Sequence, residues 1–183
     1  MELHLATGEL EAGLAEIRLS PADGGTVELV VRRPAEGERE VLDEGVLDLV
    51  EGLVGDTWRA RGSGGRPDGA ANPDAQLTVM NARAAALVAR ERERWPLAGD
   101  QLYVDLDLSA ENLPPGTRLA VGSAVIEVTP EPHTGCAKFS ARFGSDALRF
   151  INSPAGRSLR LRGVDTRVVQ PGVVRPGDSV GKV

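Results

Sequence analysis

Cys136 has the most distinctive chemistry in this chain, because it is the only cysteine among 183 residues. It ends a proline-bounded turn that also contains His133, and it precedes a short run, Ala137 to Phe143, that reads as a helix ended by Gly144. Lys138 follows two residues later. A helix N-terminus and a nearby positive charge both favour a thiolate. The sequence therefore predicts a reactive thiol at Cys136, with Lys138 and His133 as neighbours that favour its charged form.

The alternative for this cysteine is a buried side chain that acts as a small hydrophobe. The glycine and polar neighbours of Cys136 favour an exposed turn instead. A single cysteine cannot form an internal disulfide, which suits a reducing compartment. His133 and Cys136 have zinc-ligand spacing, but a second cysteine or a clustered histidine would be needed for a zinc site. They lie too close in sequence to indicate a protease dyad.

Composition limits the remaining function classes. Hydrophobic residues make up 41% of the chain and charged residues 26%, which predicts one globular domain over residues 1–183. A net charge of −6 and an aromatic share of 3% argue against a nucleic-acid partner. With no membrane-length apolar run and no visible secretory signal, we expect no membrane partner and a cytoplasmic location.

Many short strands separated by turns indicate a mainly β architecture, in which closure of the sheet removes exposed edges. The predicted strands or β-like regions are Leu14 to Leu19, Thr26 to Arg33, Glu38 to Val50, Leu77 to Met80, Leu102 to Leu108, Arg118 to Val121, Ala124 to Thr129 and Leu159 to Gln170. The segment Val173 to Val180 closes the chain with Pro-Gly-Asp turn chemistry. The predicted helices are Ala82 to Arg94, with Asn81 as N-cap, Ala137 to Phe143 and Asp146 to Ile151. The segment Arg59 to Gln76 is a long loop, of a length that is usually functional or disordered.

Several motifs follow one another in an order that resembles a known family. They are Gly52-Leu53-Val54-Gly55-Asp56, then Gln76 to Asn81 before a helix, Glu111-Asn112-Leu113, Val121 to Thr129, Cys136-Ala137-Lys138-Phe139 with Arg142-Phe143-Gly144, and Val174 to Asp178. This order resembles the MOSC domain, the C-terminal domain type of molybdenum cofactor sulfurases. The resemblance extends from about Leu14 to Val180 and is to the stand-alone bacterial kind.

The resemblance implies a closed MOSC-type β-barrel with a few peripheral α-helices. It also implies binding of molybdopterin, the pterin of the molybdenum cofactor. Cys136 matches the cysteine that carries sulfur as a persulfide or contacts molybdenum. Asp56, Thr78 and Asn112 match motif positions near the expected pocket. An arginine expected near the cysteine is replaced in His133-Thr134-Gly135, so Arg59, Arg61, Arg66 or Arg142 would have to compensate.

Three functions remain open on this reading. The first is cofactor binding with sulfur transfer through Cys136, which would make the protein a sulfurtransferase-like or molybdenum-dependent enzyme. Its partner would be a sulfur donor, for example one that binds pyridoxal phosphate, since this chain has no such domain. The second is a non-catalytic cofactor-binding or adaptor module that works with an electron-transfer protein. The third is thiol-dependent reductive detoxification of N-hydroxylated compounds.

Overall fold

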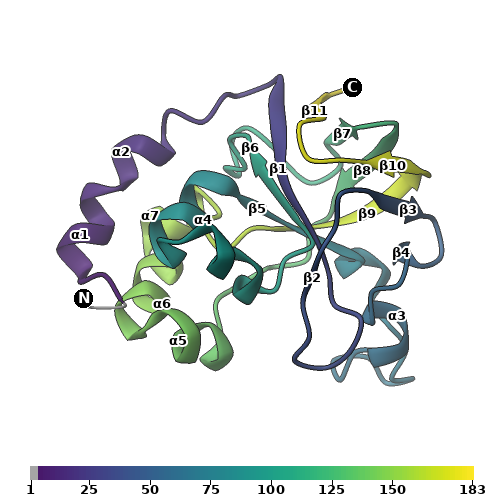
Figure 1. Ribbon diagram of the computed structural model, residues 1–183, viewed down its shortest axis with the longest axis horizontal. Coiled ribbons are helices and arrows are strands. Elements are labelled where there is room, and N and C mark those ends of the chain that lie inside the picture. The colour runs from purple at the N-terminus through teal and green to yellow at the C-terminus, as the bar shows by residue number, and fades with distance from the viewer. Residues whose placement is uncertain (1–3) are drawn as a thin grey trace.

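Seven strands form a closed ring in the computed structural model, which describes residues 4–183 (Figure 1). In order around the ring they are β1 (Gly25–Arg32), β11 (Ser179–Lys182), β7 (Arg118–Val121), β8 (Ala124–Val128), β9 (Val164–Gln170), β5 (Leu77–Asn81) and β6 (Leu102–Asp105), which pairs again with β1. Strand β2 (Glu40–Val41) pairs with β1 outside the ring. A small second sheet contains β10 (Gly172–Val174), β3 (Gly45–Asp48) and β4 (Gly52–Leu53). The predicted mainly β, closed-barrel fold is therefore confirmed.

The strand pairs of the ring are antiparallel except for β5 and β6, which run parallel. The predicted hairpin around Gly122 is present as β7 and β8, with Val121 opposite Ala124. Gly122 has a φ of +58°, and a Cβ atom there would lie 2.3 Å from the Val173 carbonyl oxygen. Glycine is thus required both for the left-handed turn and for the close approach of the neighbouring chain.

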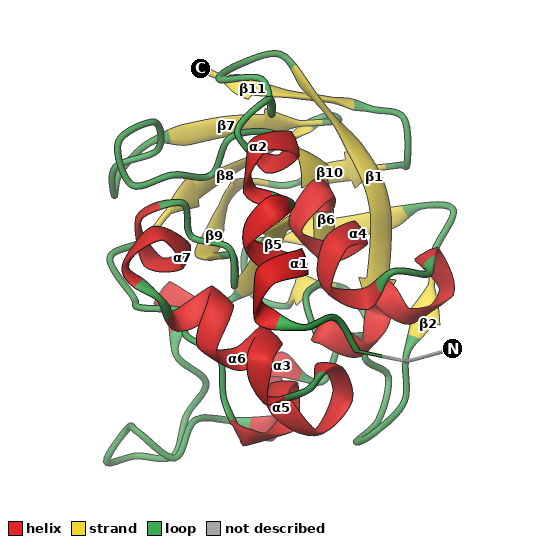
Figure 2. Cartoon of the chain, turned by 90° about the vertical axis from the view of Figure 1, so that its left-hand side faces the viewer, coloured by secondary structure: helices red, strands yellow, loops and turns green. Residues whose placement is uncertain are grey.

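Helices cover one side of the barrel (Figure 2). They are α1 (Thr7–Ala12), α2 (Leu14–Ile17), α4 (Ala82–Ala89), α5 (Ala137–Phe143), α6 (Ser145–Asn152) and α7 (Pro154–Ser158), whereas α3 (Trp58–Arg61) lies near β4. Two 3-10 helices, η1 (Pro73–Ala75) and η2 (Arg92–Ala98), complete the set. No helix among residues 4–183 has the length and apolar character needed to cross a membrane.

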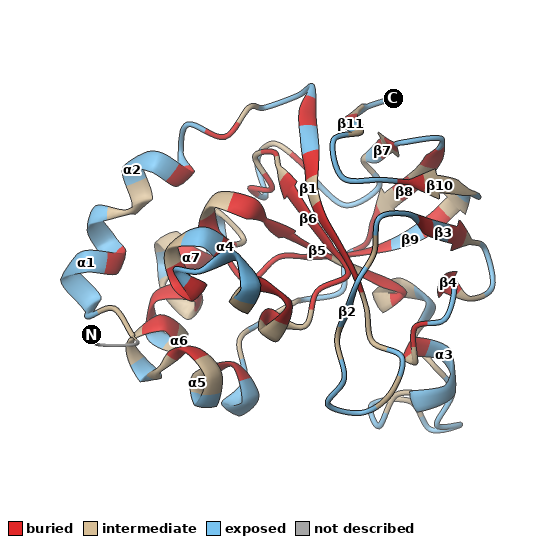
Figure 3. Ribbon diagram, viewed as in Figure 1, coloured by how far each residue is buried: buried red, intermediate tan, exposed pale blue. Residues whose placement is uncertain are grey.

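The core has two parts, one inside the barrel and one between the barrel and the helices. Figure 3 shows the buried stretches of the strands and helices. Along β6, Leu102 and Val104 belong to the cluster inside the barrel, and Tyr103 belongs to the cluster between the barrel and the helices. The sequence predicted a half-buried strand here, but Tyr103 is fully buried and its hydroxyl donates to the Trp95 carbonyl at 2.7 Å. Both faces of this strand are therefore packed.

The prediction of a strand over Leu14 to Leu19 is wrong, because Leu14–Ile17 is the helix α2. Leu10, Leu14 and Ile17 follow helical spacing, and Leu10 and Ile17 are buried in the cluster outside the barrel. Leu19 is exposed. A short apolar segment fits both the helical period and the two-residue period of a strand. The helical spacing becomes visible only when Leu10 is included.

The helix predicted over Ala82 to Arg94 ends early, at Ala89. Arg90 adopts a φ of +66°, which stops the helix, and the Arg94 guanidinium donates to the Ala89 carbonyl at 3.1 Å. The chain then continues as η2, with Pro96 inside it. The predicted N-cap is confirmed, because the Asn81 side chain accepts a hydrogen bond from the Ala84 N–H.

Other boundaries also differ from prediction. The loop predicted over Arg59 to Gln76 contains the end of α3 and all of η1, so its irregular part is residues 62–72. The strand predicted over Leu102 to Leu108 ends at Asp105, because Asp107 instead caps a turn by accepting from the Ser109 N–H. The strand predicted over Leu159 to Gln170 begins only at Val164, since Pro154–Ser158 is a helix that a turn follows.

Candidate functional site

Cys136 occupies the N-cap position of α5 and is exposed. The turn before it is held by α6, since the Gly135 N–H donates to the Asn152 side chain at 3.0 Å and the Asn152 amide donates back to the Gly135 carbonyl. A Cβ atom on Gly135 would lie 2.5 Å from Ile151 of α6. The glycine therefore permits a close contact that fixes the position of the thiol.

The Cys136 thiol has a pKa below its ordinary value. Partial burial raises that pKa, but the backbone N–H groups of Phe139 and Lys138, together with the charges of Arg162 and Lys138, outweigh the effect of burial. The thiol forms no capping hydrogen bond to the helix, so these amides act on the sulfur mainly as dipoles. The environment thus favours a thiolate.

The thiol lines a cavity of about 560 Å³, called here the arginine cavity. Its charged lining is strongly cationic, with one acid, Glu36, among the lining residues. The cationic lining residues are Arg33, Arg39, Arg61, Lys138, Arg142 and Arg162. Since like charges in one cavity repel each other, this lining is suited to an anionic ligand.

Asp56 fixes Arg33 at one wall of this cavity. The Asp56 side chain is fully buried and receives the Arg33 guanidinium through two hydrogen bonds of 2.9 Å. It also accepts from the backbone N–H groups of Arg33 and Trp58 at 2.9 Å. Burial raises the Asp56 pKa, but the hydrogen bonds and charge of Arg33 more than offset this and lower it. Asp56 thus positions an arginine, and it is absent from the lining of the arginine cavity.

Asp100 fixes Arg162 at another wall. Arg162 donates to the Asp100 carboxylate at 2.6 Å and to the Ala98 carbonyl at 2.8 Å, and its guanidinium lies 5.4 Å from the centre of the Phe139 ring. The Asp100 side chain is completely buried, which raises its pKa, but Arg162 and His133 lower the pKa to about 2. Asp100 is therefore an ionised anchor for both side chains.

Main-chain carbonyls of η2 hold two further arginines. Arg39 donates to the Pro96 carbonyl at 3.1 Å, and Arg142 donates to the Leu97 carbonyl at 2.5 Å. Burial, followed by the charges of Arg142 and Arg33, lowers the pKa of Arg39. Burial and the neighbouring cations thus disfavour the charged form of Arg39, and a bound anion would offset both effects.

Lys138 and Arg61 complete the cationic lining. Within residues 4–183, neither side chain forms a hydrogen bond or ion pair, so both are available to a ligand. Burial, followed by the charge of Arg33, lowers the pKa of Arg61.

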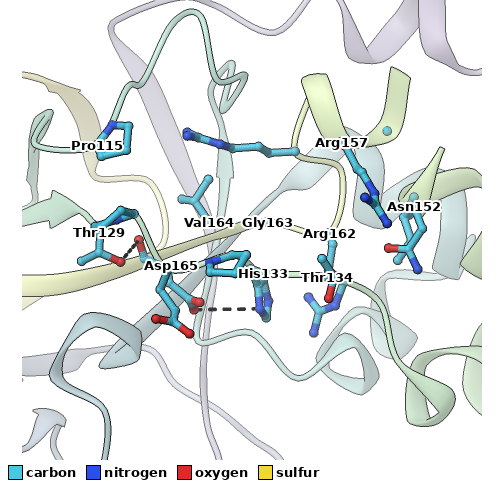
Figure 4. A pocket seen from close by; sticks show the side chains of 16 residues that line it. Pro115, Thr129, His133, Thr134, Asn152, Arg157, Arg162, Gly163, Val164 and Asp165 are labelled. Carbon is cyan, nitrogen blue, oxygen red and sulfur yellow. Dashed lines mark hydrogen bonds and ion pairs between the residues drawn. The ribbon is translucent and has the colours of Figure 1, made fainter. Parts of the chain in front are cut away.

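Two smaller cavities adjoin the arginine cavity. The Asp165 cavity, of about 270 Å³, shares Arg162 with it, and Figure 4 shows His133, Arg162 and Asp165 in its wall. The Thr78 cavity, of about 260 Å³, shares Arg33 and Arg61 with the arginine cavity. His133 and Asp165 line both smaller cavities. The three cavities are therefore neighbours that share walls.

The candidate residues predicted from the sequence are divided among the three cavities and the surface outside them. Cys136, Lys138 and Arg142 line the arginine cavity, whereas His133 and Thr78 line the smaller ones. The His133 ring faces Asp100 at 3.2 Å and is not among the groups that shift the Cys136 pKa. The Thr78 hydroxyl donates to the Gln101 side chain at 2.7 Å.

Asn112, Arg59 and Arg66 line none of these three cavities. Asn112 donates to the carbonyls of Ala22 and Asp107 and accepts from Lys182. It therefore links the segment before β1, the turn after β6 and strand β11. Arg59 pairs with Glu51, and Arg66 pairs with Asp68.

Sequence reasoning missed Arg33, Arg39, Arg162, Asp100 and Asp165. Arg33 lies 23 residues from its partner Asp56, and Arg162 lies 62 residues from Asp100, so local spacing carries no sign of either pair. The excess of arginine over lysine, 19 to 2, was the available signal, because it indicates forked contacts to carboxylates and phosphates.

Comparison with known proteins places the fold. The YuaD protein of Bacillus subtilis superposes with a TM-score of 0.65 at 16% identity, over 86% of this chain and 94% of that one. YiiM of Escherichia coli superposes with a TM-score of 0.55 at 22% identity, over 86% and 69%. YiiM of Geobacillus stearothermophilus gives 0.53 at 15% identity, over 90% and 74%. No curated protein matches the sequence.

The model of the MOSC domain matches residues 66–181, which is more than half of the chain. The matched segment contains Cys136 and most strands of the barrel ring, and it begins after Arg33, Arg39, Asp56 and Arg61. This chain belongs to the MOSC domain family.

Proposed function

We propose that this protein binds a phosphorylated pterin of the molybdenum cofactor type in the arginine cavity, with the Cys136 sulfur facing the ligand. The MOSC family is associated with the molybdenum cofactor in general. The observation that supports the assignment here is the opening of an exposed cysteine into a cavity whose other charged walls are almost all cationic. An anionic group is the ligand that this charge pattern favours.

The residues present fit such a ligand. A volume of about 560 Å³ lies within the range of ~300–1,000 Å³ that is usual for small-molecule sites. Arg33 and Arg162 are each held by a buried carboxylate, so their remaining donors are oriented before a ligand arrives. A thiolate is a suitable ligand for a soft metal and a suitable carrier of sulfur.

Each group has a distinct task in this proposal. Arg39, Arg142 and Lys138 hold the phosphate, since phosphate accepts several charge-assisted hydrogen bonds at once. Asp56 and Asp100 orient Arg33 and Arg162. A bound molybdenum cofactor would supply a metal centre for redox chemistry, and Cys136 would be the protein's ligand to it or the carrier of its sulfur.

Sulfur carriage has its own requirement, which the thiolate meets. The Cys136 thiolate attacks the outer sulfur of a persulfide donor, the donor's sulfur–sulfur bond breaks, and the donor leaves as a thiolate. Cys136 then holds one extra sulfur as a persulfide. A pyridoxal-phosphate-dependent sulfur donor is the class of partner that would supply it. Reduction of N-hydroxylated compounds and a passive adaptor role would use the same cavity.

The direct experiment measures what the native protein carries. The protein is purified from cells that make the cofactor, and its molybdenum and oxidised pterin are quantified for the wild type, Arg142→Met and Cys136→Ser. Arg118→Met, at an exposed arginine of β7 outside the cavity, is the matched control. We expect pterin in the wild type and the control, and a large loss in Arg142→Met. Equal pterin in Arg142→Met and the wild type would contradict the proposed phosphate site.

Cys136→Ser distinguishes the alternatives. Retention of pterin with loss of molybdenum would support a metal ligand, and retention of both would favour an adaptor. Sulfur carriage is tested by incubating pure protein with a persulfide donor and measuring its intact mass. An added sulfur atom on the wild type that is absent from Cys136→Ser would support it, and no adduct on the wild type would contradict it.

A further inference from the structure

Exposed apolar side chains gather in one segment of this chain. Among residues 4–183, seven large hydrophobic side chains are exposed, and five of them lie between Val41 and Val54. Single exposed hydrophobic residues are ordinary on a protein surface, but a contiguous group marks an interaction surface. The segment contains β3 and β4 of the small sheet, which lies on the side of the barrel away from α1 and α2 (Figure 1).

The outer face of the small sheet carries three valines side by side. In β3, Gly45 and Leu47 are buried, whereas Val46 between them is 45% exposed. Val173 of β10 is opposite Val46 in register, and the Val54 N–H donates to the Val46 carbonyl at 3.0 Å. Residues opposite each other in neighbouring strands point their side chains to the same face. The three valines therefore form an apolar row across the strands, on the face away from the barrel core.

The turn between β3 and β4 is apolar, although turns are usually polar. Its residues Leu49 and Val50 are 52% and 56% exposed. The geometry of the turn comes from its ends, because the Asp48 side chain accepts from the N–H groups of Val50 and Glu51 at 2.7 and 2.9 Å and Gly52 has a φ of +71°. The turn does not need the two apolar side chains, so their exposure calls for another reason.

The barrel holds this turn in place. The buried Gln76 side chain donates to the Leu49 carbonyl at 3.0 Å and accepts from the Val168 N–H at 2.8 Å. A Cβ atom on Gly52 would lie 2.8 Å from Gln76 Cγ, so glycine permits this contact. A surface that is fixed before binding loses little conformational freedom when a partner docks. The turn and the valine row are together called here the hairpin face, which consists of Val46, Leu49, Val50, Val54 and Val173.

Ion pairs border the hairpin face. The pairs are Glu44–Arg175, Glu51–Arg59 and Arg32–Glu40. Glu44 directly precedes β3 and Arg175 directly follows β10, and the Arg32 guanidinium donates to the Val54 carbonyl at 3.4 Å. The border therefore presents both signs of charge side by side, in contrast to the strongly cationic lining of the arginine cavity.

This charge pattern suits a second copy of the chain. When two identical faces meet about a two-fold axis, an acid on one border can face a base on the other. A partner with a surface of one sign would instead be repelled by half of the border. A second copy also presents the same apolar sheet face, and two such faces pack ~10 Å apart with their side chains interdigitated.

We propose that the hairpin face is the contact surface of a symmetric dimer of this chain. The two small sheets pack face to face, and the side chains of Leu49 and Val50 are buried between the copies. None of the five residues of the hairpin face lines the arginine cavity, so the dimer does not depend on the proposed ligand.

The mass of the full chain in solution tests the dimer. Light scattering is recorded on the wild type from low to high micromolar protein concentrations. We expect the mass to approach twice that of one chain as the concentration rises. The mass of one chain at every concentration would overturn the dimer and leave the hairpin face to a partner of different sequence.

Variants test whether this face forms the contact. Val46→Lys and Leu49→Lys each place a charge at an exposed position of the hairpin face, where it would be buried in the dimer. Leu19→Lys is the matched control, at an exposed leucine between α2 and β1. We expect the dimer dissociation constant to rise at least ~tenfold in both face variants and to stay unchanged in the control. An unchanged constant in either face variant would overturn the assignment.

Hydrogen exchange on the wild type locates the contact without a substitution. Backbone amides of the turn from Asp48 to Gly52 should exchange more slowly at a concentration that favours the dimer than at one that favours the single chain. The segment around Leu19 should exchange equally at both concentrations. Slower exchange at another surface, with the turn unchanged, would overturn the hairpin face as the contact even if a dimer forms.

Discussion

Replacement of Asp100 by asparagine tests the buried anchor that holds Arg162 and His133. Asp100 is completely buried, and it holds Arg162 at 2.6 Å and His133 at 3.2 Å. The substitution keeps the shape of the side chain and removes its charge. Arg162 would then remain buried, with its Ala98 contact but no counter-charge.

The expected loss of unfolding free energy can be estimated from the lowered pKa of Asp100. Lowering the Asp100 pKa from 3.8 to about 2 corresponds to about 2 kcal/mol of stabilisation, at ~1.4 kcal/mol per pKa unit. Removing one partner of a buried ion pair typically costs ~3–5 kcal/mol, since the other charge stays behind. We therefore expect Asp100→Asn to lower the free energy of unfolding by about 3 kcal/mol at pH 7.

The stabilisation by Asp100 depends on pH, because only the ionised carboxylate holds Arg162 and His133. A carboxyl group with a lowered native pKa stabilises the fold above its unfolded pKa and loses that effect as pH falls toward about 2. Urea denaturation of the wild type and Asp100→Asn should thus differ most above pH 5 and differ less at pH 3. Asp68→Asn serves as the exposed control. A difference below about 1 kcal/mol at pH 7 would refute the reasoning that Asp100 is an ionised structural anchor.

Three further outcomes are expected. Arg162→Met should slow the alkylation of Cys136 by iodoacetamide at pH 7, because loss of a nearby positive charge raises the thiol pKa and lowers the thiolate fraction; a rate equal to that of wild type would exclude this contribution. Asp165→Asn should raise the free energy of unfolding at pH 8 by about 2 kcal/mol, because the native pKa of about 6 makes the wild type lose stability as pH rises from 4 through 6; urea denaturation at pH 5 and pH 8 measures it, and a loss of stability at pH 8 would contradict it. Asn81→Ala should cost about 2 kcal/mol in the same assay, since it removes the cap of α4 and two buried hydrogen bonds; a cost near zero would contradict that role.

The barrel was predictable because its strands carry strong local signals. Gly122 marks the β7–β8 hairpin and Asn81 marks the start of α4, and both signals depend on residues within a few positions. The helix α2 was mistaken for a strand because its helical period is visible only when Leu10 is included. Local patterns thus predicted most helices and strands. They failed where a short apolar segment fits both the helical and the strand period.

The candidate site was only partly predictable. Cys136, Lys138 and Arg142 fall within one helical segment, so they could be found together. Arg33 and Arg162 reach the same cavity from opposite ends of the chain, and only the closed ring brings them there. The roles of all these residues, the single domain over 1–183 and the cytoplasmic location stay predictions.

We propose that the arginine cavity holds an anionic pterin cofactor against the Cys136 sulfur. This proposal is tested most directly by treating cofactor-containing protein with iodoacetamide and measuring intact mass and retained pterin together. We expect molecules with bound pterin to be protected at Cys136, and removal of the pterin to restore alkylation. Complete alkylation of Cys136 with the pterin fully retained would contradict it.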